Sequence, residues 1–233
     1  MKKLLLAAMT ALLLSVGAAR AGPYEDGIAY YQRGDYANAL QIFRSLAAQG
    51  NASAQFNLGV MYDLGQGVTQ DYVEAVKWYR LAAAQGNAGA QGFLGSMYAT
   101  GRGVPQDYAE AAKWFRLAAA QGDVSAQFNL GLAYHDGQGL TQDYAEAVKW
   151  FRLAAAEGDT SAQVNLSVMY FLGQGVVQDF VRAHTWVNLA GVSGDAKSVK
   201  LRDVLAAIMT PQQIAEAQKL ARECQQRNFK GCD

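Results

Sequence analysis

Hydrophobic and polar positions repeat along this chain with a period of 36 residues. Tryptophan, glutamine, tyrosine and aspartate each recur at this spacing. The repeated positions are Trp78, Trp114, Trp150 and Trp186; Gln55, Gln91, Gln127 and Gln163; Tyr62, Tyr98, Tyr134 and Tyr170; and Asp71, Asp107, Asp143 and Asp179. A single ligand site does not recur four times in phase, whereas a structural unit does. The period therefore predicts a repeat architecture.

Each unit is predicted to contain two helices. In the first full unit, Ala54, Leu58 and Met61 share one helical face, and this first helix ends at a Gly-x-Gly loop. A second helix begins at Asp71 and ends at Gly86, which is expected to adopt a left-handed conformation. Its predicted inward face consists of Ala75, Trp78, Tyr79 and Ala82.

Small residues and helix caps also repeat. Gly59, Gly95 and Gly131, with Ser167 in the fourth unit, lie in the middle of the first helices. Glycine costs about 1 kcal/mol in a helix relative to alanine, so we expect a close approach of the second helix there. Three second helices have capping-box spacing, Asp71 with Glu74, Asp107 with Glu110 and Asp143 with Glu146, whereas the fourth unit has Arg182 in place of Glu. The predicted caps of the next first helices are Asn51, Asn87, Asp123, Asp159 and Asp195.

No single unit can bury its own apolar ridge, so the units must stack into an all-α solenoid. The predicted divisions are a signal peptide (1–21), an N-terminal capping unit (22–50), four repeats (51–86, 87–122, 123–158 and 159–194) and a degenerate C-terminal capping unit (195–233). In the last of these, Thr210-Pro211-Gln212-Gln213 is a capping box with proline at the first helical position, which predicts a helix over 211–226.

The repeat resembles the Sel1-like repeat family, a branch of the tetratricopeptide-like superfamily. The segments that carry the resemblance are Leu58-Gly59-Val60-Met61-Tyr62, Gly65-Gln66-Gly67-Val68, Asp71-Tyr72 and Ala75-Val76-Lys77-Trp78-Tyr79. It covers about residues 51–194, and the N-terminal unit looks more like an ordinary tetratricopeptide repeat. The resemblance implies stacked antiparallel helix pairs wound into a right-handed superhelix. It also implies a non-catalytic scaffold for protein–protein contact, with no cofactor.

The N-terminal residues and the charge balance bear on location and partner. Lys2 and Lys3 precede an uncharged run that ends at Ala19-Arg20-Ala21, a pattern typical of a secretory signal peptide. The run is shorter than the ~20 residues of a membrane-spanning helix. We therefore expect an exported protein, periplasmic or secreted, without membrane insertion. The equal count of 20 basic and 20 acidic residues argues against a nucleic-acid partner.

Motifs of catalysis or metal binding are not found in the sequence. The two histidines, His135 and His184, lack a recurrent acidic or cysteine neighbour at ligand spacing. Gly-x-Ser-x-Gly, His-Glu-x-x-His and Ser-x-x-Lys are absent as well. Cys-rich relatives have been linked to penicillin-type ligands, so a hydrolase of cell-wall or β-lactam-type substrates remains an alternative. A purely structural assembly component is another.

The two cysteines, Cys224 and Cys232, are eight residues apart. The same step in the repeat joins Ala82 on a second helix to Ala90 on the next first helix. Cys-rich members of the family have a similar spacing that bridges adjacent helices. In an oxidising compartment the resemblance therefore implies a disulfide, with two free thiols as the alternative.

The tetratricopeptide pattern places a candidate peptide-binding groove on the side of the first helices that faces away from the second helices. The groove residues are Phe56, Asn57, Val60, Phe93, Phe128, Asn129, Leu132, His135, Val164, Asn165, Val168 and Phe171. Apolar residues with amides suit an extended segment or a helix, and the stacked asparagines could hold a peptide backbone. With no Lys or Arg among these positions, capture of a terminal carboxylate is not expected. Plain solvated surface is the alternative.

Overall fold

A computed structural model describes residues 22–192, 196–229 and 231–232. Within these ranges the chain forms twelve α-helices and no strand. The helices are α2 (Pro23–Gln32), α3 (Tyr36–Ala48), α4 (Ala52–Leu64), α5 (Tyr72–Ala84), α6 (Ala88–Thr100), α7 (Tyr108–Ala120), α8 (Val124–Asp136), α9 (Tyr144–Ala156), α10 (Thr160–Leu172), α11 (Phe180–Gly191), α12 (Ala196–Ala206) and α13 (Pro211–Gln226). The signal peptide predicted for residues 1–21 and the cap predicted at Asp195 lie outside the described residues.

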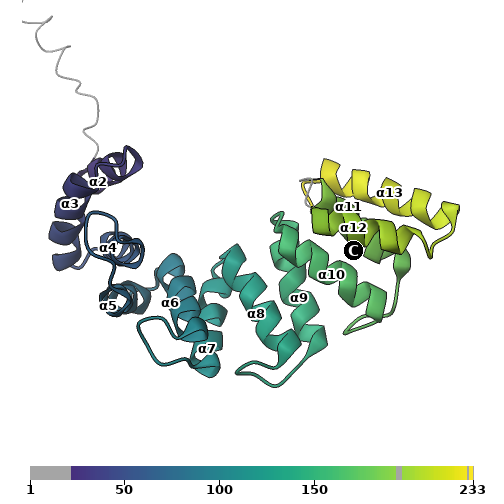
Figure 1. The fold of residues 1–233 in the computed structure, drawn as a ribbon, viewed down its shortest axis with the longest axis horizontal. Helices are drawn as coiled ribbons and strands as arrows, with labels where there is room; N and C mark the ends of the chain where they lie inside the picture. The colour runs from purple at the N-terminus through teal and green to yellow at the C-terminus, as the bar shows by residue number, and fades with distance from the viewer. Residues whose placement is uncertain (1–21, 193–195, 230, 233) are drawn as a thin grey trace, which may run out of the picture.

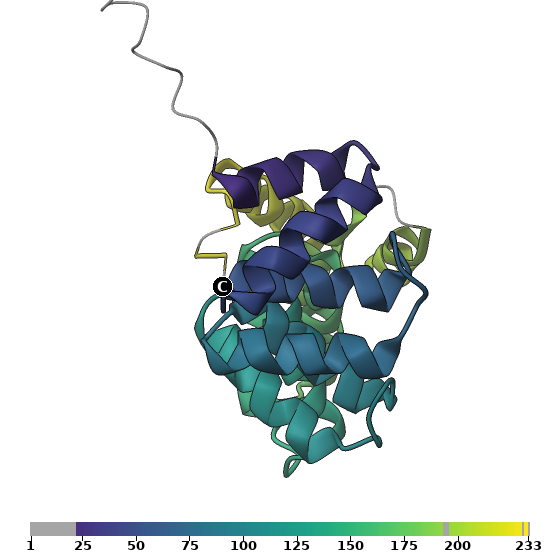
Figure 2. The same cartoon turned by 90° about the vertical axis from the view of Figure 1, so that its left-hand side faces the viewer.

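Consecutive helices pack as antiparallel pairs that follow one another along an arc, which confirms the predicted solenoid (Figure 1). The first helices α2, α4 and α6 lie on the inner side of the arc, and α3, α5 and α7 lie on its outer side. From the end of the arc, the helix axes change direction from one pair to the next (Figure 2). A helix with the length and apolar character needed to cross a bilayer is absent from the described ranges.

In the first three repeats a large ring of the second helix packs on a glycine of the first helix. A Cβ atom added to Gly95 would lie 2.7 Å from the Phe115 ring, and one added to Gly59 would lie 2.7 Å from the Tyr79 ring. The expected close approach at these glycines is confirmed. In the fourth pair, Ser167 takes the position of the glycine and a fully buried Val187 takes the position of the ring. The larger Ser167 is accommodated because the side chain that packs on it, Val187, is smaller than the rings of the other pairs.

The predicted inward face of the second helix carries a tryptophan followed by a second aromatic residue, and the two differ in how far they are buried. Trp78, Trp114 and Trp150 are half-buried, whereas the aromatic residue that follows each of them is buried. Trp78 packs against the core formed by Phe43 of α3 and Leu58 of α4, between the preceding second helix and its own first helix. Trp114 and Trp150 pack in the same way, so each of these tryptophans closes the core between its own first helix and the preceding second helix. Only Trp186, on α11 next to the C-terminal cap, is buried.

The N-cap residues cap their helices as predicted. The second hydrogen bond of a capping box, in which the N3 side chain accepts from the N-cap backbone N–H, differs from the prediction. Asp71 accepts a hydrogen bond from the backbone N–H of Glu74 at 2.9 Å, as a capping aspartate should. The Glu74 carboxylate pairs with Lys77 at 2.6 Å instead of returning to the Asp71 backbone, so the predicted capping box is half-formed. Glu110 and Glu146 likewise pair with Lys113 and Lys149. The full box predicted at Thr210 and Gln213 is confirmed, and so are both ends of α13.

The C-terminal cap covers a face of α11 that stays open on the other second helices. Both α12 and α13 contact α11. The Thr185 hydroxyl donates to the carbonyl of Ala217 on α13 at 3.3 Å. Leu189 is 4% exposed, whereas its repeat equivalents Leu117 and Leu153 are 49% and 48% exposed. The cap therefore shields the last repeat from solvent.

Candidate functional site

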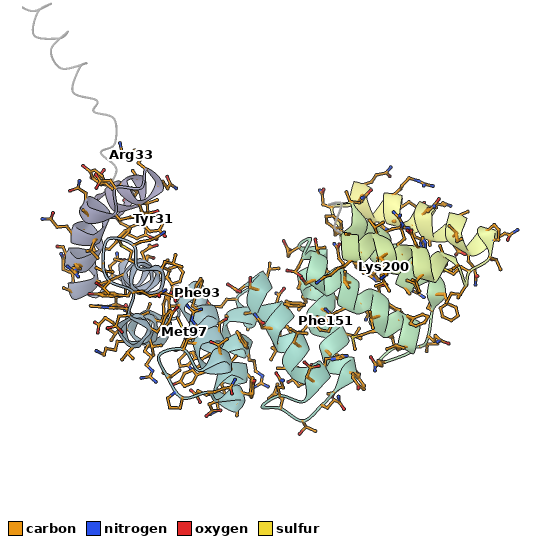
Figure 3. The ribbon with its side chains drawn as sticks, in the orientation of Figure 1. Tyr31, Arg33, Phe93, Met97, Phe151 and Lys200 are labelled. Atoms are coloured by element: carbon orange, nitrogen blue, oxygen red, sulfur yellow. A yellow bond between two sulfur atoms is a disulfide. The ribbon has the colours of Figure 1, made fainter. Side chains whose placement is uncertain are left out.

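The predicted groove residues lie on α4, α6, α8 and α10, and most of them are half-buried. Phe93 is the most open, with 42% of its surface exposed, and it lies on the inner side of the arc (Figure 3). The half-buried members are Phe56, Asn57, Val60, Phe128, Asn129, Leu132, His135, Val164, Asn165, Val168 and Phe171. The set therefore forms a partly closed surface and not an open row of side chains.

The three stacked asparagines hydrogen-bond to their own helices. The amide nitrogens of Asn129 and Asn165 donate to the carbonyl oxygens of Ser125 and Ser161, each at 2.9 Å. Asn57 donates in the same way to Ser53, at 3.0 Å, and also donates to the Tyr24 hydroxyl at 2.8 Å. Asn57 therefore connects α4 to α2, while the carbonyl oxygens of the other two asparagines are the groups best placed to accept from a ligand.

His135 and Phe171 lie at the loop ends of their helix pairs. The His135 ring is 5.3 Å from the ring of Tyr144, the first residue of α9, and its Nδ1 lies 2.6 Å from Asp136. Phe171 is 5.8 Å from Phe180, the first residue of α11. These two side chains help to join each first helix to its own second helix.

A cavity of about 300 Å³ opens between α6 and α8, beside the end of α4. It is lined by Asp63, Gly92, Phe93, Ser96, Met97, Thr100, Arg102, Asp123, Ser125, Ala126 and Asn129. Phe93 and Asn129 belong to the predicted groove, so the structure brings these two members together at one site.

The cavity exists because of a single change in the repeat. Gly92 occupies the position held by Phe56 in α4 and by Phe128 in α8. The Phe56 ring fills the corresponding space one layer earlier, where its nearest atom is 3.1 Å from a Cβ added to Gly89. A Cβ added to Gly92 would meet nothing closer than Asp123, at 3.6 Å. The missing phenyl ring therefore leaves the space open.

An ion pair forms one wall of the cavity. The Arg102 guanidinium donates to Asp63 Oδ1 at 2.7 Å and lies over the Tyr72 ring, 4.2 Å from its centre. Asp63 is 5% exposed and also accepts from the Tyr79 hydroxyl at 3.4 Å. Burial, followed by the negative charge of Asp63, raises the pKa of Tyr79.

The loop after α6 places Arg102 in this wall. Gly103 has a positive φ of 70°, and a Cβ there would lie 2.2 Å from the carbonyl oxygen of Tyr72. Only glycine allows this approach, which brings Arg102 next to a carboxylate 39 residues earlier in the chain. Of the residues that line this cavity, the sequence predicted Phe93 and Asn129 as binding residues, but it did not assign Arg102, Thr100 or Asp123 to a site. A signal was available, because Asp63 and Arg102 are each the only residue of their type at their repeat position.

Other reactive groups lie apart from this cavity. His184, on α11, is 2% exposed, and its Nδ1 lies 3.0 Å from Asn188 Nδ2. Burial, and then the positive charge of Arg202, lowers the pKa of His184. Cys224 and Cys232 form a disulfide at the C-terminal end of α13. Nowhere in the described part of the chain do three His, Cys, Asp or Glu side chains gather to hold a metal ion.

The stacked pairs and the inner-face cavity define a helical-repeat solenoid of the tetratricopeptide-like class. The chain belongs to the Sel1 repeat family, whose family model matches residues 15–51, 52–87, 88–123, 124–159 and 160–192. This confirms the resemblance seen in the sequence. The first match begins inside the predicted signal peptide and continues through the N-terminal unit. Sel1 repeat proteins are generally scaffolds for protein–protein interaction and typically non-catalytic adaptors.

Three solved structures resemble the chain. A Sel1 repeat protein from Oxalobacter formigenes is 32% identical with a TM-score of 0.70, and the match covers 88% of this chain and 77% of that one. A protective antigen of uropathogenic Escherichia coli strains is 26% identical with a TM-score of 0.52, covering 90% and 62%. A Sel1 repeat protein from Klebsiella pneumoniae is 22% identical with a TM-score of 0.50, covering 79% and 91%, and shares the fold. Among curated proteins, none matches.

Proposed function

We propose that this protein is an exported scaffold that binds a segment of a partner protein along the inner face of the arc. The cavity beside Gly92 anchors one side chain of that segment. The observation that carries this proposal is the local break in the repeat. The space that Phe56 fills in its own layer is left open at Gly92, and an exposed Phe93 stands at its rim. Apolar anchors that enter such pockets dominate the energetics of many protein interfaces.

The sequences of the neighbouring repeats suggest a variant that tests the groove. The double substitution Gly92→Phe with Phe93→Asn gives α6 the Phe-Asn pair that α4 and α8 have at the same repeat position. We expect this variant to fold and to fill the cavity. In a crosslinking pull-down analysed by mass spectrometry, partners captured by the natural protein should then be lost.

A matched control changes the outer face. Leu117→Gln alters a side chain that is 49% exposed on α7 and should retain the same partners. If the filled variant keeps every partner, groove binding is refuted. If the Leu117 variant loses them instead, the outer face makes the contacts, as a purely structural assembly component would.

Export is supported by the basic and apolar pattern of the first residues and by the Cys224–Cys232 disulfide, since such bonds persist in oxidising compartments. N-terminal sequencing of the protein recovered from the periplasm or medium should start at Gly22. Recovery of a chain that still begins at Met1, in the cytoplasm alone, would contradict export.

A further inference from the structure

We infer that the partner segment is basic and apolar: one apolar side chain enters the cavity at Gly92, and a neighbouring Lys or Arg meets the acidic rim beside Asp123. This inference rests on the proposed function and names the chemistry of its partner. It follows from how charge is distributed over the helices and from which hydrogen-bonding atoms the cavity offers.

Basic residues are unevenly distributed between the first and second helices of the repeats, whereas acidic residues lie on both. The helices α4, α6, α8 and α10 contain no Lys or Arg, and their acidic residues and N-caps include Asp63, Asp123, Asp136 and Asp159. The basic residues of the same units lie on the second helices, at Lys77, Arg80, Lys113, Arg116, Lys149, Arg152 and Arg182, except for Arg102, which lies in the loop after α6. The inner side of the repeats is therefore acidic, and it attracts a basic segment through complementary charge.

The cavity walls combine apolar surface with hydrogen-bond acceptors. Phe93, Met97 and Ala126 provide the apolar surface. The hydroxyl groups of Ser96 and Thr100 donate to carbonyl oxygens of their own helix, at 3.2 Å and 2.7 Å. Because their protons are used in this way, these hydroxyl oxygens face a ligand as acceptors. An ammonium or guanidinium group supplies only donors, so it matches this set.

Asp123 carries the charge nearest to the open position. Its carboxylate caps α8 by accepting from the Ala126 N–H at 2.7 Å, and it lies 3.6 Å from the Cβ position at Gly92. Arg102 is the only basic side chain of the cavity wall, and it is paired with Asp63. Its side chain is 44% exposed, so an acidic segment is the competing occupant. Together, Asp63, Asp123 and Arg102 give the cavity wall a net negative charge, which favours the basic segment.

Selection from a phage library of random peptides tests the partner chemistry. The natural protein is the bait, and peptides that also bind the Gly92→Phe/Phe93→Asn variant are removed. We expect the remaining sequences to carry Lys or Arg within a few residues of an apolar side chain. Enrichment of acidic or uncharged sequences overturns this inference but leaves groove binding intact. Recovery of no peptide that distinguishes the two proteins counts against the proposed function and against this inference with it.

The selected peptide is then measured against Asp123→Asn by fluorescence anisotropy. Asn51 and Asn87 cap α4 and α6 at the same repeat position, so this substitution keeps the cap and removes the charge. Affinity should fall on the order of threefold at low salt, and the difference should shrink as salt rises. Asp143→Asn, at the cap of the second helix α9, is the control and should not change affinity. Equal affinity of the Asp123 variant and the natural protein at low salt overturns the assignment.

Discussion

Buried glutamines connect successive units at the level of single atoms. The side-chain nitrogens of Gln55, Gln91 and Gln127 donate to carbonyl oxygens of the preceding second helix at 3.2–3.3 Å. The side-chain oxygens of Gln55 and Gln91 accept from Gln85 and Gln121, both at 2.7 Å. In the third unit that donor is replaced by Glu157, and Gln127 Oε1 has no hydrogen-bond partner among the described residues. An unsatisfied buried oxygen costs about 1–3 kcal/mol.

Glu157→Gln should therefore stabilise the protein. The new amide would donate to Gln127 Oε1 as its equivalents do one and two units earlier, and we expect a gain of about 1 kcal/mol in the free energy of unfolding. Urea denaturation at neutral pH measures this change. The reverse substitution, Gln121→Glu, should destabilise the protein by a similar amount because it removes the hydrogen-bond donor to Gln91 Oε1. An unchanged urea midpoint in both variants would show that water satisfies these oxygens equally well.

At the level of single residues, the sequence predicted some contacts and missed others. The repeat predicted which glycines meet a second helix, because a helix-destabilising residue that recurs in phase needs a packing reason. It did not separate Trp78 from Tyr79, because both lie near the same helix face and only the curvature of the stack decides which is buried. Arg102 was missed because its partner Asp63 belongs to the preceding unit, and the contact depends on the path of a loop.

At the scale of helices, two of the three glycines of α6, Gly92 and Gly95, have opposite roles. A Cβ at Gly95 would lie 2.7 Å from the Phe115 ring, whereas at Gly92 the nearest atom is at 3.6 Å. Gly95→Ala should destabilise the protein by about 1–3 kcal/mol, because overpacking outweighs the gain in helix propensity. Gly92→Ala, in the same helix, should raise stability by up to ~1 kcal/mol. Thermal unfolding followed by circular dichroism compares them, and two shifts of the same sign would contradict the close packing at Gly95.

The burial of His184 on α11 makes the C-terminal cap sensitive to acid. Its pKa is lowered by burial and by Arg202, while the nearby Asp203 has the opposite effect. The unfolded chain therefore binds a proton more readily, so this residue's contribution to stability is present above pH ~6.5 and is lost as the pH falls below it. His184→Val, which copies Val76 and Val148, should reduce the loss of stability between pH 8 and pH 5.5. Parallel stability curves for the two proteins would exclude His184 as the sensor.

At the scale of the whole molecule, the period alone was enough to predict the solenoid, since stacking is the only way such units bury their apolar faces. The candidate site was predicted less completely. The tetratricopeptide pattern pointed to the side of the first helices that faces away from the second helices, and Phe93 and Asn129 do meet at the cavity. The cavity itself depends on what neighbouring layers leave unfilled. Gly92 becomes informative only when it is compared with the phenylalanines of the layers on either side.

Contacts in this fold run between neighbouring helices, so a local perturbation should stay local. The disulfide between Cys224 and Cys232 closes a short loop, and its removal should cost about 2–3 kcal/mol. Phe229, within that loop, reaches Gly158 between α9 and α10. We therefore expect Cys224→Ala/Cys232→Ala to speed amide hydrogen exchange in α13 and in the exposed side of α11, and to leave α4–α8 unchanged. Reduction of the natural protein should give the same map. Faster exchange throughout the arc would instead show that the stack unfolds as a single cooperative unit.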